Sequence, residues 1–322
     1  VSSHRCCLYV IIISVFNTIS GFSYDKEDYD MSDIKADIST LVKQARESEQ
    51  KKNCAKGLDV AHMAHKRIVP TTVGDITVLE YGFNSDTPEP FMIDLHGGGF
   101  IFNTADVDEQ IILQMRKVVP HAKFISIDYP KAPEYPFPAA PDSIYETIRF
   151  YVDHAQDLGI DTEKMVIGGH SAGANLATVT CLRCQERREF FFKGQILDYP
   201  PLDLKTPAKE KPTPTGCIPP DLAELFNACY VGSYDAAFPE ISPIFSKAEN
   251  LHNMPPAFII TCGHDSLCEE GIQYASMLEK SGVSVSLHQY PDELHGFTYD
   301  NTPSAIEAIN SMADFFKHCI QN

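Results

Sequence analysis

Two short glycine-rich strings in this chain carry the residue types that acyl-transfer chemistry needs. Residues 169–173, Gly-His-Ser-Ala-Gly, follow the pattern G-x-S-x-G, in which a sharp strand-to-helix turn exposes a nucleophilic serine. Residues 96–100, His-Gly-Gly-Gly-Phe, contain HGGG, whose backbone N–H groups can bind a developing oxyanion. Chance gives roughly 0.07 matches to the first pattern and roughly 0.002 to the second in a chain of this composition. Together they predict a serine hydrolase.

The serine requires two partners, because its hydroxyl is a weak nucleophile at neutral pH. A histidine must accept its proton and a carboxylate must orient the histidine, and with this motif the chain order is serine, acid, histidine. Asp265 follows the strand-like run 258–261, and His295 follows the strand-like run 285–290. Open α/β sheets place their sites at the carboxyl ends of strands. We therefore predict Ser171 as nucleophile, Asp265 as acid and His295 as base.

The chain offers rivals for both partners. Asp292 could replace Asp265, but it lies only three residues before His295. His264 precedes Asp265 and so breaks the expected order. Other histidines have no strand-end context, and we expect them on the surface: His121, His154, His252 and His318.

Backbone N–H groups are expected to form the oxyanion hole. Ala172 follows the nucleophile and begins a helix, so its N–H has no intrahelical acceptor and favours an anion. Gly98 and Gly99 are the expected further donors, because glycine lets the backbone approach a substrate closely. We interpret His170 as a side chain that points away from the nucleophile; the alternative is an effect on local charge or substrate choice.

Composition argues against several kinds of partner and cofactor. Asp and Glu number 44 against 26 Lys and Arg, which gives a formal net charge of −18 and disfavours nucleic acid and anionic membranes as partners. Cys181 and Cys184 form a C-x-x-C without the second pair that a zinc site needs. His62 and His65 are interpreted as surface residues of a helix. We expect neither a metal nor an organic cofactor.

Hydrophobic periodicity predicts the elements that must position these groups. Strand-like and helix-like stretches alternate, which indicates a largely parallel, doubly wound sheet. The expected strands are 75–81, 91–95, 123–128, 164–168, 195–198, 257–261 and 285–290. The expected helices are 31–66, 106–119, 142–156, 172–188, 269–281 and 304–319. Prolines interrupt this rhythm at 129–141, a loop, and at 200–240, an insertion typical of a lid or substrate-binding element.

Several strings together resemble the hormone-sensitive-lipase-like branch of the α/β-hydrolase fold family, which includes bacterial esterases and arylacetamide-deacetylase-like enzymes. The shared strings are HGGGF at 96–100, DYPxAPExPFPA at 128–139, GxSAGxNLA at 169–177, DxL at 265–267 and HGF at 295–297. Many members carry Asp before the serine where this chain has His170, and Gly where it has Ala174.

The resemblance implies an α/β-hydrolase fold with a mostly parallel central sheet flanked by helices. It also implies a helical cap built from the N-terminal helices, 31–66, and the insertion at 200–240. Its implied site is the triad and hole already predicted: Ser171, Asp265 and His295, with the amides of Gly98, Gly99 and Ala172.

These observations favour a serine carboxylesterase that hydrolyses small esters with short acyl chains through an acyl-enzyme. An amidase or deacetylase on the same triad is one alternative, and a non-catalytic ligand receptor on the same fold is another. The expected partner is a small-molecule ester, and homodimer formation stays open.

The N-terminus has two interpretations. Residues 8–16 form an apolar run that resembles the core of a signal peptide and is short for a bilayer span. Residues 1–30 are therefore either an export signal or a leader upstream of a single domain at 31–322. The scattered cysteines and the lack of an N-x-S/T sequon favour a cytoplasmic protein, with export as the alternative.

Overall fold

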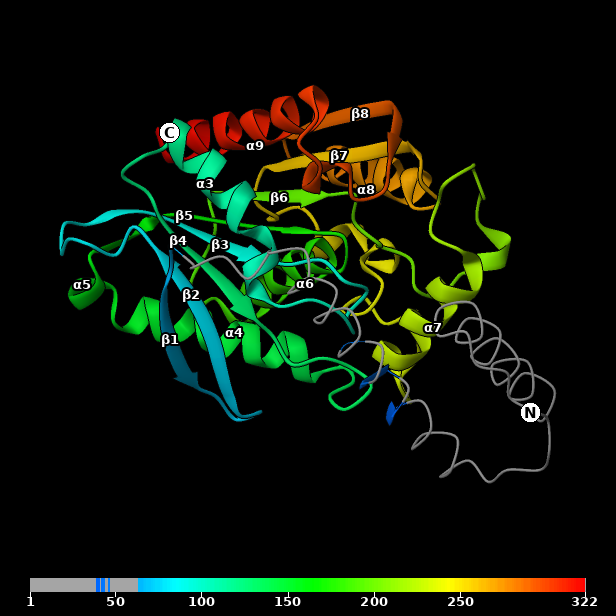
Figure 1. Ribbon diagram of the computed structural model, residues 1–322, viewed down its shortest axis with the longest axis horizontal. Coiled ribbons are helices and arrows are strands. Elements are labelled where there is room, and N and C mark those ends of the chain that lie inside the picture. Colours follow the sequence, from blue (N-terminus) through cyan, green and yellow to red (C-terminus); the bar gives the residue numbers. More distant parts are fainter. Residues whose placement is uncertain (1–38, 41, 44–45, 47–62, 322) are drawn as a thin grey trace.

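The computed structural model describes residues 39–40, 42–43, 46 and 63–321. The expected leader at 1–30 and most of the helix expected at 31–66 lie outside the described residues. The described part forms one eight-stranded sheet with the strand order β1-β2-β4-β3-β5-β6-β7-β8 (Figure 1). Among its helices, none combines the length and apolar composition that crossing a membrane requires.

The structure confirms the strands and helices expected from 75 onwards. The strands are β1 (His65–Pro70), β2 (Asp75–Tyr81), β3 (Glu89–Leu95), β4 (Lys123–Asp128), β5 (Ile160–His170), β6 (Gly194–Asp198), β7 (Ala257–His264) and β8 (Val285–Leu294). The helices are α3 (Glu109–Val118), α4 (Ala139–Asp153), α5 (Ala155–Leu158), α6 (Ala172–Arg187), α7 (Pro220–Val231), α8 (Cys268–Lys280) and α9 (Pro303–Gln321). Short 3₁₀ helices are η1 (Ala105–Asp108), η2 (Ala208–Glu210), η3 (Pro243–Phe245), η4 (Ala248–Asn250) and η5 (Phe297–Tyr299).

The predicted C-terminal boundary of the helix expected at 31–66 is wrong, because strand β1 begins at His65. This edge strand pairs antiparallel with β2 and is mostly polar, so its sequence lacks a clear apolar alternation. Its side chains contact the buried carboxylate of Glu80: His65 Nδ1 lies 2.8 Å from it, and Arg67 donates to it. His65 therefore lies on a strand rather than on a helix face, and His62 lies outside the described residues.

The central sheet is mostly parallel, as expected. Only β1, β2 and β4 meet antiparallel among the described strands, whereas β4-β3-β5-β6-β7-β8 run parallel. Parallel strands need helical crossovers, which cover both faces, so the central strands are apolar almost throughout. Consecutive side chains of β3 accordingly enter different cores: Phe91 and Ile93 one, Met92 the other.

Helices cover both faces of the sheet (Figure 1). The core that contains Phe91 includes residues of α4, α6 and α8, such as Ile144, Leu176 and Leu278. The core that contains Met92 includes residues of α3 and α9. The strand ends between these layers hold the predicted site residues.

The turn from β5 into α6 is closely packed against neighbouring backbone. Ser171, at its apex, has φ +51° and ψ −119°, a conformation that L-residues rarely adopt. Helix α6 begins so close to the end of β3 that a Cβ on Gly173 would lie 1.9 Å from the carbonyl oxygen of Leu95. A Cβ on Gly169 would lie 2.4 Å from the carbonyl carbon of Gly173. Both motif glycines are therefore required by backbone packing.

We expect Gly173→Ala to lower the free energy of unfolding by about 3 kcal/mol or more, because the new methyl group meets backbone that cannot move aside. Gly168→Ala is the matched control, since its methyl first meets the flexible tip of Met92, at 2.7 Å. Urea unfolding of both variants measures the difference. Equal losses would contradict this account of the junction.

Candidate active site

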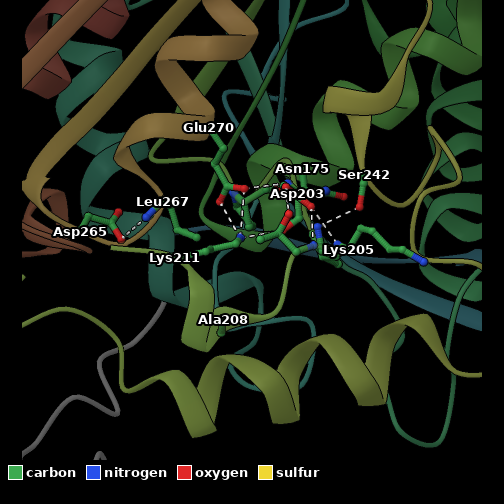
Figure 2. Close-up of polar contacts among 12 residues, drawn as sticks. Asn175, Asp203, Lys205, Ala208, Lys211, Ser242, Asp265, Leu267 and Glu270 are labelled. Carbon is green, nitrogen blue, oxygen red and sulfur yellow. Dashed lines mark hydrogen bonds and ion pairs between the residues drawn. The ribbon is translucent and has the colours of Figure 1, made fainter. Parts of the chain in front are cut away.

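Three strand ends bring Ser171, His295 and Asp265 into one hydrogen-bonded line. His295 Nε2 lies 2.8 Å from Ser171 Oγ, and His295 Nδ1 lies 2.7 Å from Asp265 Oδ2. The backbone N–H of Leu267 donates to the other oxygen of Asp265, at 3.1 Å (Figure 2). In such a line the imidazole can take the serine proton while the carboxylate fixes its tautomer.

The rival residues lie elsewhere. Asp292 is exposed, and His264 Nδ1 lies 3.2 Å from the carbonyl oxygen of Thr215 in the insertion. The histidines expected on the surface are all exposed: His121, His154, His252 and His318. The structure thus brings the predicted acid and base to the serine and leaves their competitors apart.

The loop after β3 is held by polar contacts and lies beside the serine. His96 Nδ1 lies 2.7 Å from the carbonyl oxygen of Gly97, whose N–H donates to the Tyr299 hydroxyl at 3.3 Å. Gly98 and Gly99 have φ +125° and +59°, conformations that favour glycine. Both glycines line a recess together with Ser171. The arrangement brings the expected oxyanion donors of this loop, with Ala172 at the start of α6, to the nucleophile.

Sequence reasoning missed Tyr299, which supports this loop from the far end of the chain. Its hydroxyl accepts from Gly97 and donates to Asp108 Oδ1 at 2.8 Å. Tyr299 lies two residues after the HGF string at 295–297, so proximity to a predicted catalytic residue was the one available signal.

Residues 92–299 match the family model described as alpha/beta hydrolase fold. The chain belongs to the α/β-hydrolase family. Within it, the chain belongs to the hormone-sensitive-lipase-like, carboxylesterase branch, as the shared strings indicated.

Named relatives agree with this placement. Esterase LipI of Mycobacterium tuberculosis is 31% identical over 225 residues, which cover 69% of this chain and 70% of LipI. Carboxylesterase NlhH of the same organism is 31% identical over 212 residues, or 65% of this chain and 66% of NlhH. The hyperthermophilic esterase of the archaeon Pyrobaculum calidifontis has a similar structure, with a TM-score of 0.76, 30% identity, and coverage of 88% and 97% of the two chains.

Two recesses of this α/β-hydrolase meet at Ser171. The wider one, about 750 Å³ and open to solvent, is lined by His295 and Leu222. The narrower one, about 490 Å³ with part of it open, is lined by Leu267 and Lys211. Phe226 of α7 borders both, and a Cβ on Gly99 would lie 2.4 Å from its ring. Residues of the 200–240 insertion therefore form walls of the site.

A partly buried polar network joins the insertion to α8 beside the narrower recess (Figure 2). Lys211 Nζ donates to the carbonyl oxygen of Asp203 at 2.6 Å and contacts Glu270 Oε2 at 3.1 Å. The Asp203 N–H donates to the same Glu270 oxygen at 2.8 Å. Burial raises the pKa of Glu270 to about 8, since lost hydration outweighs the opposing effect of Lys211.

His170 is buried away from both recesses, in line with the interpretation that it points away from the nucleophile. Its Nδ1 donates to Asp198 Oδ2 at 2.7 Å. Burial alone lowers the pKa of the imidazole, but Asp108, Asp198 and Asp94 together outweigh this effect and raise the pKa well above its usual value.

Cys181 of the C-x-x-C pair is buried on α6, and burial raises the pKa of its thiol.

The Glu270 carboxyl makes stability depend on pH. Its folded-state pKa, about 8, exceeds the ordinary value of 4.5, so its contribution to stability is complete below pH 4.5 and is lost as the pH rises to about 8. We expect Glu270→Gln to reduce the fall in the free energy of unfolding across this window. Urea unfolding at several pH values between 4.5 and about 8 measures this fall, and Glu269→Gln, at an exposed position, is the control. An unchanged pH dependence in Glu270→Gln would contradict the assignment.

Proposed function

We propose that Ser171, His295 and Asp265 hydrolyse small carboxylic esters with short acyl chains through an acyl-enzyme. The enzyme class, a serine ester hydrolase with carboxylesterase activity, follows from the family to which the chain belongs. The hydrogen-bonded line from Ser171 Oγ through His295 to Asp265 is the observation that carries the proposed roles.

The first half-reaction forms the acyl-enzyme. Ser171 Oγ attacks the ester carbonyl carbon while His295 Nε2 takes its proton, and Asp265 stabilises the resulting imidazolium. The carbonyl oxygen gains the negative charge, which the N–H groups of Gly98, Gly99 and Ala172 would bind. The C–O bond to the alcohol then breaks, and His295 gives its proton to the departing oxygen.

The second half-reaction releases the acid. His295 removes a proton from a water molecule, whose oxygen attacks the acyl carbon attached to Ser171. The same backbone N–H groups stabilise the second oxyanion. Ser171 leaves with the proton from His295, and the free enzyme returns.

The position of His295 supports an assignment of the two recesses. Because His295 must reach the alcohol oxygen, we infer that the alcohol occupies the recess that His295 lines and the acyl group occupies the narrower one. Lys211, anchored to Glu270, borders this acyl recess, which is the smaller of the two. This supports short acyl chains, and it supports the proposal that the 200–240 insertion acts as part of a cap.

We expect Asp265→Asn to lower kcat by about 10⁴-fold, because the amide disfavours the histidine tautomer that accepts the serine proton. The exposed Asp292→Asn is the matched control and should keep wild-type turnover of p-nitrophenyl acetate. Ser171→Ala should abolish turnover. Hydrolysis by Ser171→Ala, or equal effects at Asp265 and Asp292, would overturn the roles, and a preference for matched anilides would favour the amidase alternative.

The acyl preference can be measured with p-nitrophenyl esters from acetate to dodecanoate. We expect the highest kcat/KM at butyrate or shorter. Leu267→Ala, which enlarges only the acyl recess, should raise the hexanoate-to-acetate ratio of kcat/KM, whereas Leu222→Ala, in the other recess, should leave it unchanged. Because both esters are measured on the same preparation, a loss of folded enzyme does not change this ratio. A maximum at long chains, or equal shifts in both variants, would sink the assignment of the recesses.

A further inference from the structure

A second group of titratable side chains lies buried next to the serine turn and takes no part in the proposed reaction. His170 of β5 is surrounded by carboxylates from three other elements: Asp94 of β3, Asp108 of η1 and Asp198 of β6. None of the four is more than 4% exposed. One ligand atom each from Asp94, Asp108 and His170 lies within 4.8 Å of the others.

The histidine turns its Nε2 toward these acids. Its Nδ1 donates to Asp198 Oδ2 at 2.7 Å, and the Thr298 hydroxyl donates to the same oxygen at 2.7 Å. Its Nε2 lies 3.6 Å from Asp94 Oδ1, beyond a normal hydrogen bond. A carboxylate that fixes one imidazole nitrogen while the other faces acidic ligands is the usual second shell of a metal-bound histidine.

The acids also have unused acceptor capacity. Asp94 accepts from Ser126 through Oδ2 at 2.9 Å, which leaves Oδ1 toward His170. Asp108 accepts from Tyr299 through Oδ1, and its Oδ2, fully buried, has no hydrogen-bond partner within the described part of the chain. A buried carboxylate oxygen without a partner raises the free energy of the folded state, so a proton or a cation is needed to stabilise this atom.

The charge of the cluster also requires a proton or a cation. Three carboxylates bring a formal charge of −3, and among the described residues no Lys or Arg forms an ion pair with any of them. One divalent cation, or two protons, would reduce the net charge of the cluster to −1. The orientation of His170, with Nδ1 fixed by Asp198 and Nε2 facing Asp94, favours the cation.

We propose that Asp94, Asp108 and His170 Nε2 bind one divalent transition-metal ion of the Zn²⁺ or Mn²⁺ kind. Imidazole with carboxylates suits these ions, whereas Mg²⁺ and Ca²⁺ prefer all-oxygen sites. The ion would connect β3, β5 and η1. Since Tyr299 joins Asp108 to the N–H of Gly97, it would also brace the loop that carries the oxyanion donors. Its role is structural, because the line from Ser171 to Asp265 does not include it.

Metal binding tests the proposal on the full chain after removal of metals with a chelator. Isothermal titration with Zn²⁺ and with Mn²⁺ should show one ion per chain, and the unfolding temperature should rise with occupancy. Asp108→Asn should weaken binding at least about tenfold. Asp106→Asn, two residues away and outside the cluster, should bind as the wild type does.

Each alternative outcome overturns the proposal. If the wild type binds neither ion and its unfolding temperature is unaffected, protons balance the cluster. If Asp108→Asn and Asp94→Asn bind as tightly as wild type, the ion lies elsewhere, and if only Mg²⁺ or Ca²⁺ binds, the ligand assignment is wrong. If Asp108→Asn fails to fold, the stoichiometry of the wild type and the metal affinity of Asp94→Asn still test the proposal. Ester turnover is not a readout, so the result stands apart from the proposed function.

Discussion

The structure depends on the approach of helix α6 to the end of β3, which leaves no space for a side-chain carbon at Gly173. This contact forces the chain through the strained backbone of Ser171, and the hydrogen bond from the Ser171 N–H to the carbonyl oxygen of Asp198, at 2.8 Å, holds it there. The loop with Gly98 and Gly99 leaves β3 at the same point. One steric constraint therefore places the serine beside its expected oxyanion donors.

The same junction connects the reacting groups to the buried acids. Asp198 holds the turn through its backbone and His170 through its side chain. Asp108 is linked to the glycine loop through Tyr299. The serine turn and its loop thus share neighbours with a cluster of buried charge, and the protonation or ligation of that cluster can influence the site without contact with a substrate.

Local sequence could predict the parts of the site that depend on strand ends. The G-x-S-x-G motif indicated Ser171, and Asp265 and His295 could be predicted because parallel strands end at one edge of the sheet, so position along the chain indicates position in space. The Tyr299–Asp108 contact could not be found, because it joins residues 191 apart through packing that no local pattern encodes. Strand β1 was missed because pairing with β2 and a buried carboxylate stabilise it, rather than an apolar alternation.

Phe226 borders both recesses and touches the glycine loop between them. Under the proposed assignment of the recesses, a replacement of this ring would alter the space for the alcohol and for the acyl group at once, so the two halves of substrate choice would not diverge independently at this position. Leu222 and Ala208 each border one recess only. On the same assignment, evolution can adjust the space for the alcohol or for the acyl group separately at positions such as Leu222 and Ala208. A change at Phe226 would affect both spaces together.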